Sequence, residues 1–315
     1  MINVSKLEDQ NILVTGGSGF LGHHIVKCLE QENPRRIISF SSKQYDLTNE
    51  EAVKSLFTDN DIDVVIHAAA DVGGIGYNST HPGQQFYKNI MMNTLVQHYA
   101  KLKNVKKFVG IGSVCEYPAE APVPFKEDDI WNGYPIEDND AYALSKRMLL
   151  AQSIVYRKEY GFNAVHLLPI NLYGPRDNFD LASAHVIPAL VRKIHTALVH
   201  DISEVEVWGT GEETREFLFV EDAARAIVSA TKYYNSSQPI NIGTGEEVKI
   251  KTVADEIKNI LGYRGKFVYN TDKPGGHKRR QLDVSRANEA FGFEAKITLR
   301  EGLKRTIDYW VTTNE

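Results

Sequence analysis

The amino-acid sequence predicts an α/β fold, in which a doubly wound, mostly parallel sheet is joined by a smaller, interleaved α/β region. Two observations lead to this prediction. Short β-rich runs alternate with helical patterns along the first 175 residues, which is the rhythm of βαβ units. After that point the rhythm loosens without an internal repeat or a low-complexity tether. The second region is therefore expected to be interleaved with the first, not attached by a linker.

The first strand and helix are separated by a glycine-rich turn. Residues 11–14 form an apolar, β-rich run, and Gly17, Gly19 and Gly22 then follow the spacing G-x-G-x-x-G. Gly16, Gly19 and Gly22 fit the related spacing G-x-x-G-x-x-G equally well. Glycines let a pyrophosphate approach the helix N-terminus closely. A tight turn without a ligand is the alternative, but the position between a strand and a helix favours a dinucleotide site in a Rossmann-type fold.

Further strand-like runs lead directly to polar residues. The runs cover residues 36–40, 63–69, 107–112 and 164–168. Ser113 and Asn171 stand just beyond the last two runs. In parallel sheets ligands bind beyond the carboxyl ends of the strands, so both residues are expected at the site.

Tyr142 and Lys146 are four residues apart, which places both on one face of a helix. The ammonium of Lys146 is expected to lower the pKa of the Tyr142 phenol, so that Tyr142 exchanges a proton with a carbonyl or alcohol oxygen near neutral pH. The hydroxyl of Ser113 could hold the same oxygen. Reduction of a ketone needs no cysteine, so the thiol of Cys115 suggests a second reaction in the same pocket.

The composition argues against several classes of function. The net charge is −5, and no run of Lys or Arg is long enough for a nucleic-acid arm. No apolar run approaches the ~20 residues of a membrane span, and the first ten residues lack the apolar core of a signal peptide. With two cysteines, Cys28 and Cys115, a reducing cytoplasm is expected, and Cys28 is interpreted as helix packing. The ten histidines show no metal-ligand spacing, and the adjacent His23 and His24 are interpreted as surface residues; no bound metal is expected.

Residues 39–43 indicate which nicotinamide cofactor binds. NAD-selective sites carry an acidic residue about 20 positions beyond the glycines, but this stretch reads Ser-Phe-Ser-Ser-Lys. No carboxylate repels a 2′-phosphate there, and Ser42 and Lys43 could hold one, so NADPH is expected. The alternative is that Ser42 and Lys43 are simply exposed loop residues. Asp46 and Leu47 are expected at the adenine edge.

Longer motifs point to a known family. They cover residues 72–75, 113–118, 142–146, 171–179, 185–190, 208–211 and 215–217. With these motifs the chain resembles the extended short-chain dehydrogenase/reductases over nearly its full length, and within them the GDP-L-fucose synthase family of 3,5-epimerase-4-reductases. The glycine motif and the Tyr–Lys pair belong to the whole superfamily. Residues 171–179 followed by 185–190 are specific to the narrower family.

The resemblance implies a role for each reactive residue. The C4 ketone of a GDP-4-keto-6-deoxymannose substrate acidifies the hydrogens on C3 and C5, and Cys115 and His185 match the Cys and His with which the family removes and returns such protons. Tyr142 would protonate O4 as NADPH delivers hydride to C4. Lys146 would lower the pKa of Tyr142 and hold the nicotinamide ribose, and Ser113 would hydrogen-bond O4. Epimerisation must come first, because reduction destroys the acidifying carbonyl.

The resemblance also implies the binding residues and the division into domains. The cofactor would contact Gly16, Gly19, Phe20, Leu21, Gly22, Ser42, Lys43, Asp46, Leu47, Ala68, Tyr142, Lys146 and Asn171. The sugar nucleotide would contact Asn171, Arg192, Trp208, Arg215 and Arg279, although Arg192 could equally lie on a solvated helix face and Trp208 in the core. Residues 1–175, with 215–245 returning, would form the NADP-binding Rossmann domain, and residues 176–315 mainly the sugar-nucleotide-binding domain. Members of the family usually form homodimers, so the resemblance also implies a homodimer.

Several positions depart from the family pattern. The family usually has Lys at Asp71, Ser at Val114 and at Ala184, and an apolar residue at Glu116, and it has an acidic residue near Gly275. Arginines that help to bind the NADP phosphate are missing from the glycine loop. Because of these departures, the resemblance does not decide which sugar the protein binds.

Two alternatives to a GDP-L-fucose-forming enzyme therefore stay open. One is a reductase or epimerase of a related sugar nucleotide, of the 3,6-dideoxyhexose or heptose type. The other is a non-catalytic NADP-binding regulator, against which the intact Ser113, Tyr142 and Lys146 argue. Related 4,6-dehydratases carry Asp and Glu at the positions of Val114 and Cys115, so dehydration lacks its acid and base here.

Overall fold

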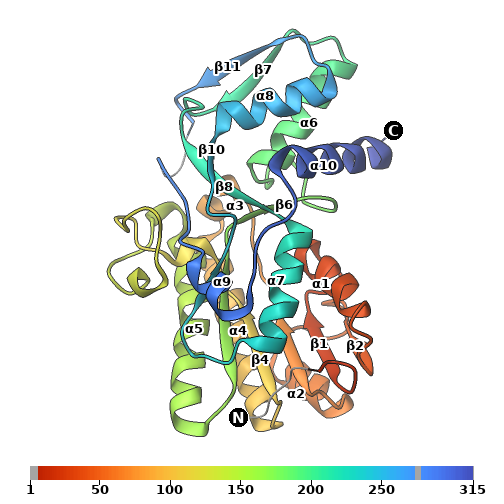
Figure 1. Cartoon of the computed structure of the whole chain (residues 1–315), viewed down its shortest axis with the longest axis vertical. Coiled ribbons are helices and arrows are strands. Elements are labelled where there is room, and N and C mark those ends of the chain that lie inside the picture. Colours follow the sequence, from red (N-terminus) through yellow and green to blue (C-terminus); the bar gives the residue numbers. More distant parts are fainter. Residues whose placement is uncertain (1–5, 274–277, 315) are drawn as a thin grey trace.

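The computed structural model describes residues 6–273 and 278–314, which form two lobes (Figure 1). The larger lobe is built on a six-stranded sheet with the order β2-β1-β3-β4-β5-β9, in which every pairing is parallel. Its strands are β1 (Asn11–Thr15), β2 (Arg36–Ile38), β3 (Val64–His67), β4 (Lys107–Ile111), β5 (Ala164–Pro169) and β9 (Ile240–Ile242). The predicted Rossmann-type, doubly wound parallel sheet is confirmed.

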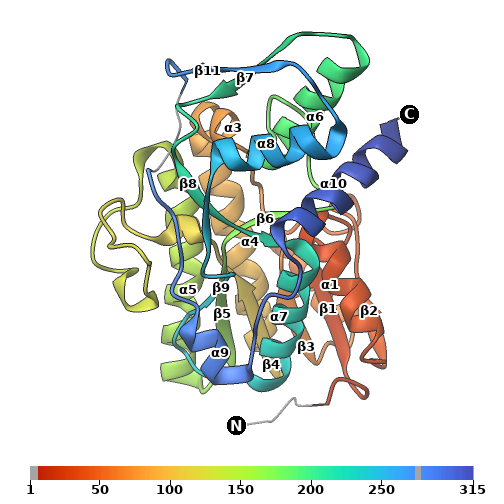
Figure 2. The ribbon, with the colours of Figure 1, turned by 45° about the horizontal axis from the view of Figure 1, so that its top comes forward.

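Helices cover both faces of this sheet, so its inner strands are rich in Val, Ile and Leu and buried on both sides, whereas the edge strand β2 is partly exposed. One face carries α1 (Phe20–Glu30), α7 (Val220–Tyr233) and α9 (Ser285–Phe291), and the other carries α2 (Glu50–Asp59), α4 (Pro82–Leu102) and α5 (Asp140–Tyr160). Figure 2 shows α7 and α9 in front of β5 and β9. Residues near the C-terminus thus pack against the larger lobe.

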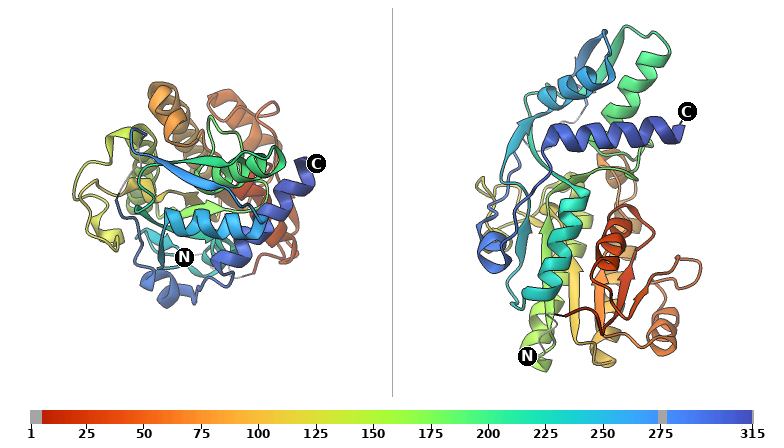
Figure 3. Two further views of the ribbon diagram at one scale, coloured as in Figure 1. Left: turned by 90° about the horizontal axis from the view of Figure 1, so that it is seen from above. Right: turned by 45° about the vertical axis from the view of Figure 1, so that its right-hand side comes forward.

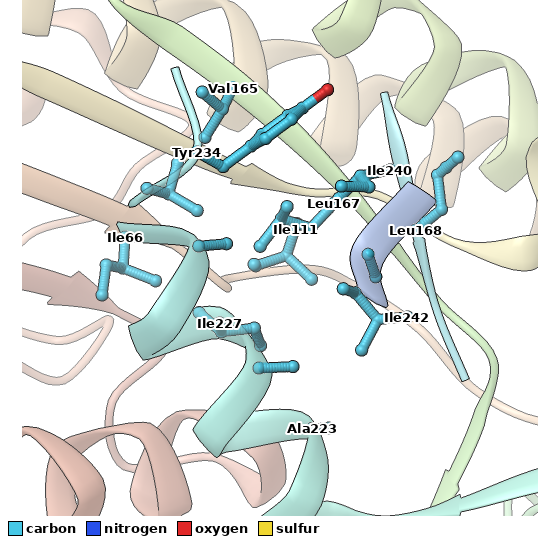
Figure 4. Packing of buried hydrophobic residues seen from close by; sticks show 14 of the residues in the cluster. Ile66, Ile111, Val165, Leu167, Leu168, Ala223, Ile227, Tyr234, Ile240 and Ile242 are labelled. Atoms are coloured by element: carbon cyan, nitrogen blue, oxygen red, sulfur yellow. The ribbon is translucent and has the colours of Figure 1, made fainter. Parts of the chain in front are cut away.

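The core between the sheet and α7 consists mainly of aliphatic side chains, together with Tyr234 (Figure 4). Ile66 of β3, Ile111 of β4 and Leu167 of β5 pack with Ala223 and Ile227 of α7. Small residues such as Ala223 on the inner face of α7 allow a close approach to the β-branched side chains of the sheet. This packing fixes the carboxyl ends of the strands, where the site lies.

The smaller lobe has its own apolar core, which is formed around α6 (Val186–Val199), α8 (Ile250–Leu261) and α10 (Leu299–Asn314). Two small sheets complete it, one of β6 (Asn171–Tyr173), β8 (Thr214–Phe219) and β10 (Glu247–Lys249) and one of β7 (Glu204–Trp208) and β11 (Lys266–Asn270). Figure 3 shows this lobe lying over one end of the larger sheet. Because β6 follows β5 after a single residue, the two lobes are interleaved and directly joined.

The strand order reverses beside β1, which has β2 on one side and β3 on the other. Open α/β sheets bind ligands in the crevice at such a switch point. The turn after β1 and the chain after β3 therefore lie where a ligand is expected. Among the described residues, no helix combines the length and apolar character that crossing a membrane requires.

Candidate active site

A pocket of about 870 Å³ lies at the carboxyl ends of β1, β3, β4 and β5 and extends under the smaller lobe. It brings together most of the residues that the sequence predicts. Those that line it are Gly16, Gly19, Phe20, Leu21, Gly22, Ser42, Asp46, Leu47, Ala68, Ser113, Cys115, Tyr142, Lys146, Asn171, His185, Trp208 and Arg215. Lys43, Arg192 and Arg279 do not line it. Within the described part of the chain, no group of His, Cys, Asp and Glu side chains could hold a metal ion.

The glycine turn has the shape of a pyrophosphate cradle. Gly16 has a φ of +69°, and a Cβ on Gly22 would lie 2.0 Å from the carbonyl oxygen of Gly16. The N–H of Gly19 donates to the same oxygen at 2.9 Å. The turn therefore requires glycine for its conformation and its close packing, and it directs the N-terminus of α1 toward the pocket. These features fit a dinucleotide cofactor.

Ser113 and Cys115 lie on a single turn of 3₁₀-helix, η1 (Val114–Glu116), directly after β4. The Oγ of Ser113 accepts a hydrogen bond from the backbone N–H of Cys115 at 3.2 Å. The carboxylate of Glu116 accepts the backbone N–H of Ser113 at 2.8 Å, which completes a capping box. The turn thus presents the hydroxyl and the thiol together at the pocket wall.

Tyr142 and Lys146 lie one turn apart on α5, as the sequence predicts. The Nζ of Lys146 donates to the carbonyl of Ile111 at 2.8 Å and lies 5.7 Å from the centre of the Tyr142 ring. Burial lowers the pKa of Lys146 to about 8.

The expectation that Lys146 lowers the pKa of Tyr142 is wrong for the ligand-free protein. Burial raises the pKa of the Tyr142 phenol, Cys115 and Glu116 raise it further, and a hydrogen bond with Ser113 opposes them. Burial has the largest effect on this pKa because it removes the phenolate from water. The Lys146 ammonium instead donates its hydrogen bond to the Ile111 carbonyl. Tyr142 is therefore a neutral phenol at neutral pH, which is the form that donates a proton.

His185 enters the pocket from the smaller lobe, where it is the N-cap residue of α6. Its ring is accessible from the open pocket. Desolvation by the surrounding walls, together with the positive charge of Arg280, lowers the pKa of His185. Cys115 and His185 thus face one pocket from different lobes.

Three arginines line the pocket, Arg176, Arg215 and Arg280, of which the sequence predicts only Arg215 as a binding residue. Burial lowers the pKa of Arg215 to about 10, and the charge of Arg280 adds to this effect, so the two guanidiniums lie near each other. The Nη1 of Arg280 also lies 3.8 Å from the Sγ of Cys115. Two close cations in a half-buried pocket are suited to a diphosphate.

Two predicted arginines lie elsewhere. Arg279 is exposed and ion-pairs with Glu247, and Arg192 donates to the carbonyl of Phe179. The structure places Arg280 and Lys193 at the pocket instead.

Simple periodicity could have found Lys193, but for Arg280 it shows only that Arg279 and Arg280 point to opposite sides. Lys193 lies two helical turns after Val186, on the same face of α6, whereas Arg192 is displaced by about 100°. Alternation along the extended chain beside β8 separates Arg280 from Arg279, because successive side chains point to opposite sides.

Other sequence interpretations have definite outcomes. The interpretation of His24 as a surface residue is wrong, because the side chain is buried. Its Nε2 lies 3.0 Å from the carbonyl oxygen of Pro175. Cys28 packs against the core, as expected. Trp208 is 40% exposed and lines the pocket, so it is not a core residue. The departure near Gly275 lies outside the described residues.

The departure at Asp71 has a structural explanation. Its carboxylate accepts from the hydroxyl of Tyr77 at 2.8 Å and pairs with the ammonium of Lys88 at 2.9 Å. The side chain of Asn89 holds the backbone of Asp71: its Oδ1 accepts from the Asp71 N–H, and its Nδ2 donates to the Asp71 carbonyl. Asp71 therefore anchors the chain after β3 to α4, and its carboxylate does not line the pocket.

These features define a class of protein: a nicotinamide-dependent enzyme with a Ser–Tyr–Lys set in a Rossmann-type fold. The chain belongs to the NAD dependent epimerase/dehydratase family, whose model matches residues 12–243. It is 37% identical to GDP-L-fucose synthase 1 of Arabidopsis thaliana over 98% of this chain and 96% of that protein. The resemblance seen in the sequence is confirmed.

Solved structures agree with this assignment. A GDP-6-OMe-4-keto-L-xylo-heptose reductase from C. jejuni has a TM-score of 0.91 at 29% identity, covering 98% of this chain and 99% of that one. A GDP-L-fucose synthetase from Naegleria fowleri bound to NADP has a TM-score of 0.89 at 28% identity, covering 97% and 95%.

Proposed function

We propose that this protein is an NADPH-dependent 3,5-epimerase-4-reductase that converts GDP-4-keto-6-deoxymannose to GDP-L-fucose. One observation carries the proposal: Cys115 and His185 line the same pocket as Ser113, Tyr142 and Lys146. A simple 4-reductase needs only the last three residues. Similarity to GDP-L-fucose synthases over nearly the whole chain supports the choice of sugar nucleotide.

In the epimerase half, Cys115 and His185 act as the proton-transfer pair on the carbons beside the ketone. One removes the proton from C3 or C5, and the other returns a proton to the opposite face, which inverts that carbon. Arg280 donates toward the Cys115 sulfur, and a neighbouring cation stabilises negative charge there. Ser113 and Tyr142 hold O4, where negative charge develops when the proton leaves.

In the reductase half, Tyr142 donates its phenolic proton to O4. NADPH, when bound, supplies the hydride for C4. Lys146, one turn away on α5, would orient the ribose beside the nicotinamide. Its ammonium would also stabilise the phenolate that forms when Tyr142 donates its proton. The glycine turn after β1 binds the pyrophosphate, and Arg215 and Arg280 bind the diphosphate of the substrate.

Two variants separate the two halves. Cys115→Ser should slow deuterium exchange at C3 and C5 by about a hundredfold or more, since a positioned acid or base contributes 10²–10⁴-fold. Tyr142→Phe should block NADPH oxidation, and it should slow exchange much less than Cys115→Ser does, because Ser113 still holds O4. Exchange is followed by NMR in deuterated water, and NADPH by absorbance. Normal exchange in Cys115→Ser would place the base elsewhere.

A second candidate function is reduction alone, on a related GDP-linked heptose. The likeness to a GDP-heptose reductase favours it. NADPH oxidation with a 4-keto-heptose and no incorporation of deuterium would support this candidate over the first.

We also propose NADPH over NADH, a cytoplasmic location and a homodimer. Residues 39–43, where NAD-selective sites carry an acidic residue, contain no carboxylate, and a related structure holds NADP. Both cysteines are free thiols, which suits a reducing compartment. Paired titrations with NADPH and NADH test the cofactor preference, and a preference for NADH would overturn it.

A further inference from the structure

A buried acid and imidazole lie directly beneath the turn that carries Ser113 and Cys115. Glu116 is 0% exposed and His166 is 1% exposed, and the Nε2 of His166 lies 3.0 and 3.1 Å from the two carboxylate oxygens of Glu116. Neither side chain lines the pocket. A buried carboxylate costs free energy unless it is paired and hydrogen-bonded, so this pair requires an explanation.

The pair is tied to the catalytic turn by direct contacts. The same carboxylate oxygen of Glu116 that contacts His166 accepts the backbone N–H of Ser113 at 2.8 Å. Gly112 leaves the room that the pair needs, because a Cβ there would lie 2.2 Å from Oε1 of Glu116 and 2.3 Å from Nε2 of His166. The carboxylate therefore connects β5, which carries His166, to the start of the turn.

The hydrogen bonds around the imidazole favour one position for its proton. The Nδ1 of His166 has no hydrogen-bond partner among the described residues. A ring that carries its proton at Nε2 donates to Glu116 and leaves no buried N–H unpaired. The pair then places one negative charge below the turn.

Charged and titratable groups face this carboxylate from each neighbouring element. From α5 they are Tyr142, Lys146 and Arg147, and the Nε of Arg147 donates to the carbonyl of Glu116 at 2.6 Å. From β5 there is His166, and from the turn itself Cys115 and Tyr117. The charge of Glu116 raises the pKa of Tyr142 and of Lys146.

We propose that Glu116 and His166 are positioning residues: the carboxylate, anchored by the imidazole, holds the backbone of Ser113 and so fixes the Ser113 hydroxyl and the Cys115 thiol against the substrate. The pair also keeps a negative charge beneath Tyr142. The role is mediated by the turn, since neither side chain reaches the pocket. This inference rests on the proposed function of the same site.

Four variants test it. Glu116→Gln keeps an acceptor for the Ser113 N–H but removes the charge, and Glu116→Leu removes both. His166→Gln keeps a donor near the position of Nε2, and His166→Leu removes it. Glu127→Gln is the matched control, because Glu127 is also buried and accepts a backbone N–H, from Asn241, but lies away from the pocket.

Rates of C3/C5 exchange without NADPH and of NADPH oxidation are measured against pH, with thermal melting for each variant. Glu116→Leu and His166→Leu should lose about tenfold or more in kcat of both reactions, which is about 1.4 kcal/mol, with little change in KM. His166→Gln should keep most of the wild-type rate. In Glu116→Gln the alkaline limb of the reduction profile should move to lower pH, because Lys146, whose pKa is about 8, loses the nearby charge that raises its pKa. Glu127→Gln should melt earlier but keep the wild-type profile.

The outcomes distinguish this inference from the proposed function. If the wild type catalyses exchange and reduction but Glu116→Gln has the wild-type profile, or His166→Leu matches His166→Gln in kcat, the positioning role is wrong. If the wild type catalyses neither reaction, the proposed function fails, and the inference fails with it.

Discussion

At the scale of single residues, the most specific prediction concerns which arginine binds the sugar nucleotide. Arg280 lies beside Cys115 and near Arg215 in the pocket, whereas Arg279, one position away, pairs with Glu247 at the surface. Arg280→Ala should raise the KM for the sugar nucleotide about tenfold or more, since charged hydrogen bonds contribute about 1.5–3 kcal/mol.

Arg279→Ala is the matched control. Its ion pair is exposed and contributes at most about 1 kcal/mol to stability. Steady-state kinetics give the KM for the sugar nucleotide in both variants and show which arginine binds it. A larger effect from Arg279 than from Arg280 would contradict the assignment.

Individual residues were predictable where a motif fixes them and much less so elsewhere. Ser113, Tyr142 and Lys146 reach the pocket because their motif ties residue type to position on a strand end or a helix. Arg279 was chosen over Arg280 because the sequence gives no register for an extended segment outside a regular sheet. The Glu116–His166 pair could not be predicted, because its partners are 50 residues apart and meet only when β4 and β5 pair.

At the scale of elements, the turn between β1 and α1 makes the sharpest prediction. A Cβ at Gly22 would lie 2.0 Å from the Gly16 carbonyl oxygen and 2.8 Å from the Cα of Gly17. Gly22→Ala must therefore push the start of α1 away from the turn. Binding of NADPH should weaken about a hundredfold, equivalent to about 2.7 kcal/mol.

Gly83→Ala provides the control, because Gly83 lies in the first turn of α4 and a Cβ there would have no neighbouring atom within 4 Å. Fluorescence titration with NADPH measures both variants. Equal affinities for Gly22→Ala and wild type would show that the turn does not hold the cofactor.

The elements themselves were largely predictable, because hydrophobic pattern and turn chemistry agree. The strand β1 is buried throughout and apolar in its middle, and α5 is followed by Gly161 in the left-handed conformation that favours glycine. The sequence also predicts the helix α6. It assigns Arg192 to the site, whereas the face of α6 that lines the pocket carries Lys193.

At the scale of the whole molecule, the proposed homodimer has a definite surface. The neighbouring helices α4 and α5 carry exposed apolar side chains, which are Phe86, Tyr87, Met148 and Val155. Such groups on adjacent helices suit an isologous interface. Val155, which is 53% exposed, should form part of it.

Val155→Lys should convert the dimer to a monomer, because it buries an unpaired charge at the interface. Val199→Lys is the control, since Val199 is 61% exposed but lies at the end of α6 in the other lobe. Light scattering coupled to size exclusion gives the mass. A dimer that survives Val155→Lys would exclude this surface.

The interleaving of the two lobes was predictable from the absence of a linker, and the return of residues 215–245 was expected from the resemblance, but the packing of α9 against the larger lobe was not expected. After β8 the chain returns to the larger lobe through α7 and β9, and α9 packs there as well. These returns depend on which apolar faces meet in three dimensions, and the local pattern of α7 or α9 does not encode its partner.

The central claim is that one pocket performs both proton exchange and reduction. The most direct test incubates the wild-type enzyme with GDP-4-keto-6-deoxymannose in deuterated water, with and without NADPH, and follows C3 and C5 by NMR. We expect deuterium at both carbons in either case, and consumption of NADPH with formation of a 4-hydroxy product when NADPH is present. Consumption of NADPH with no deuterium at C3 or C5 would contradict the claim.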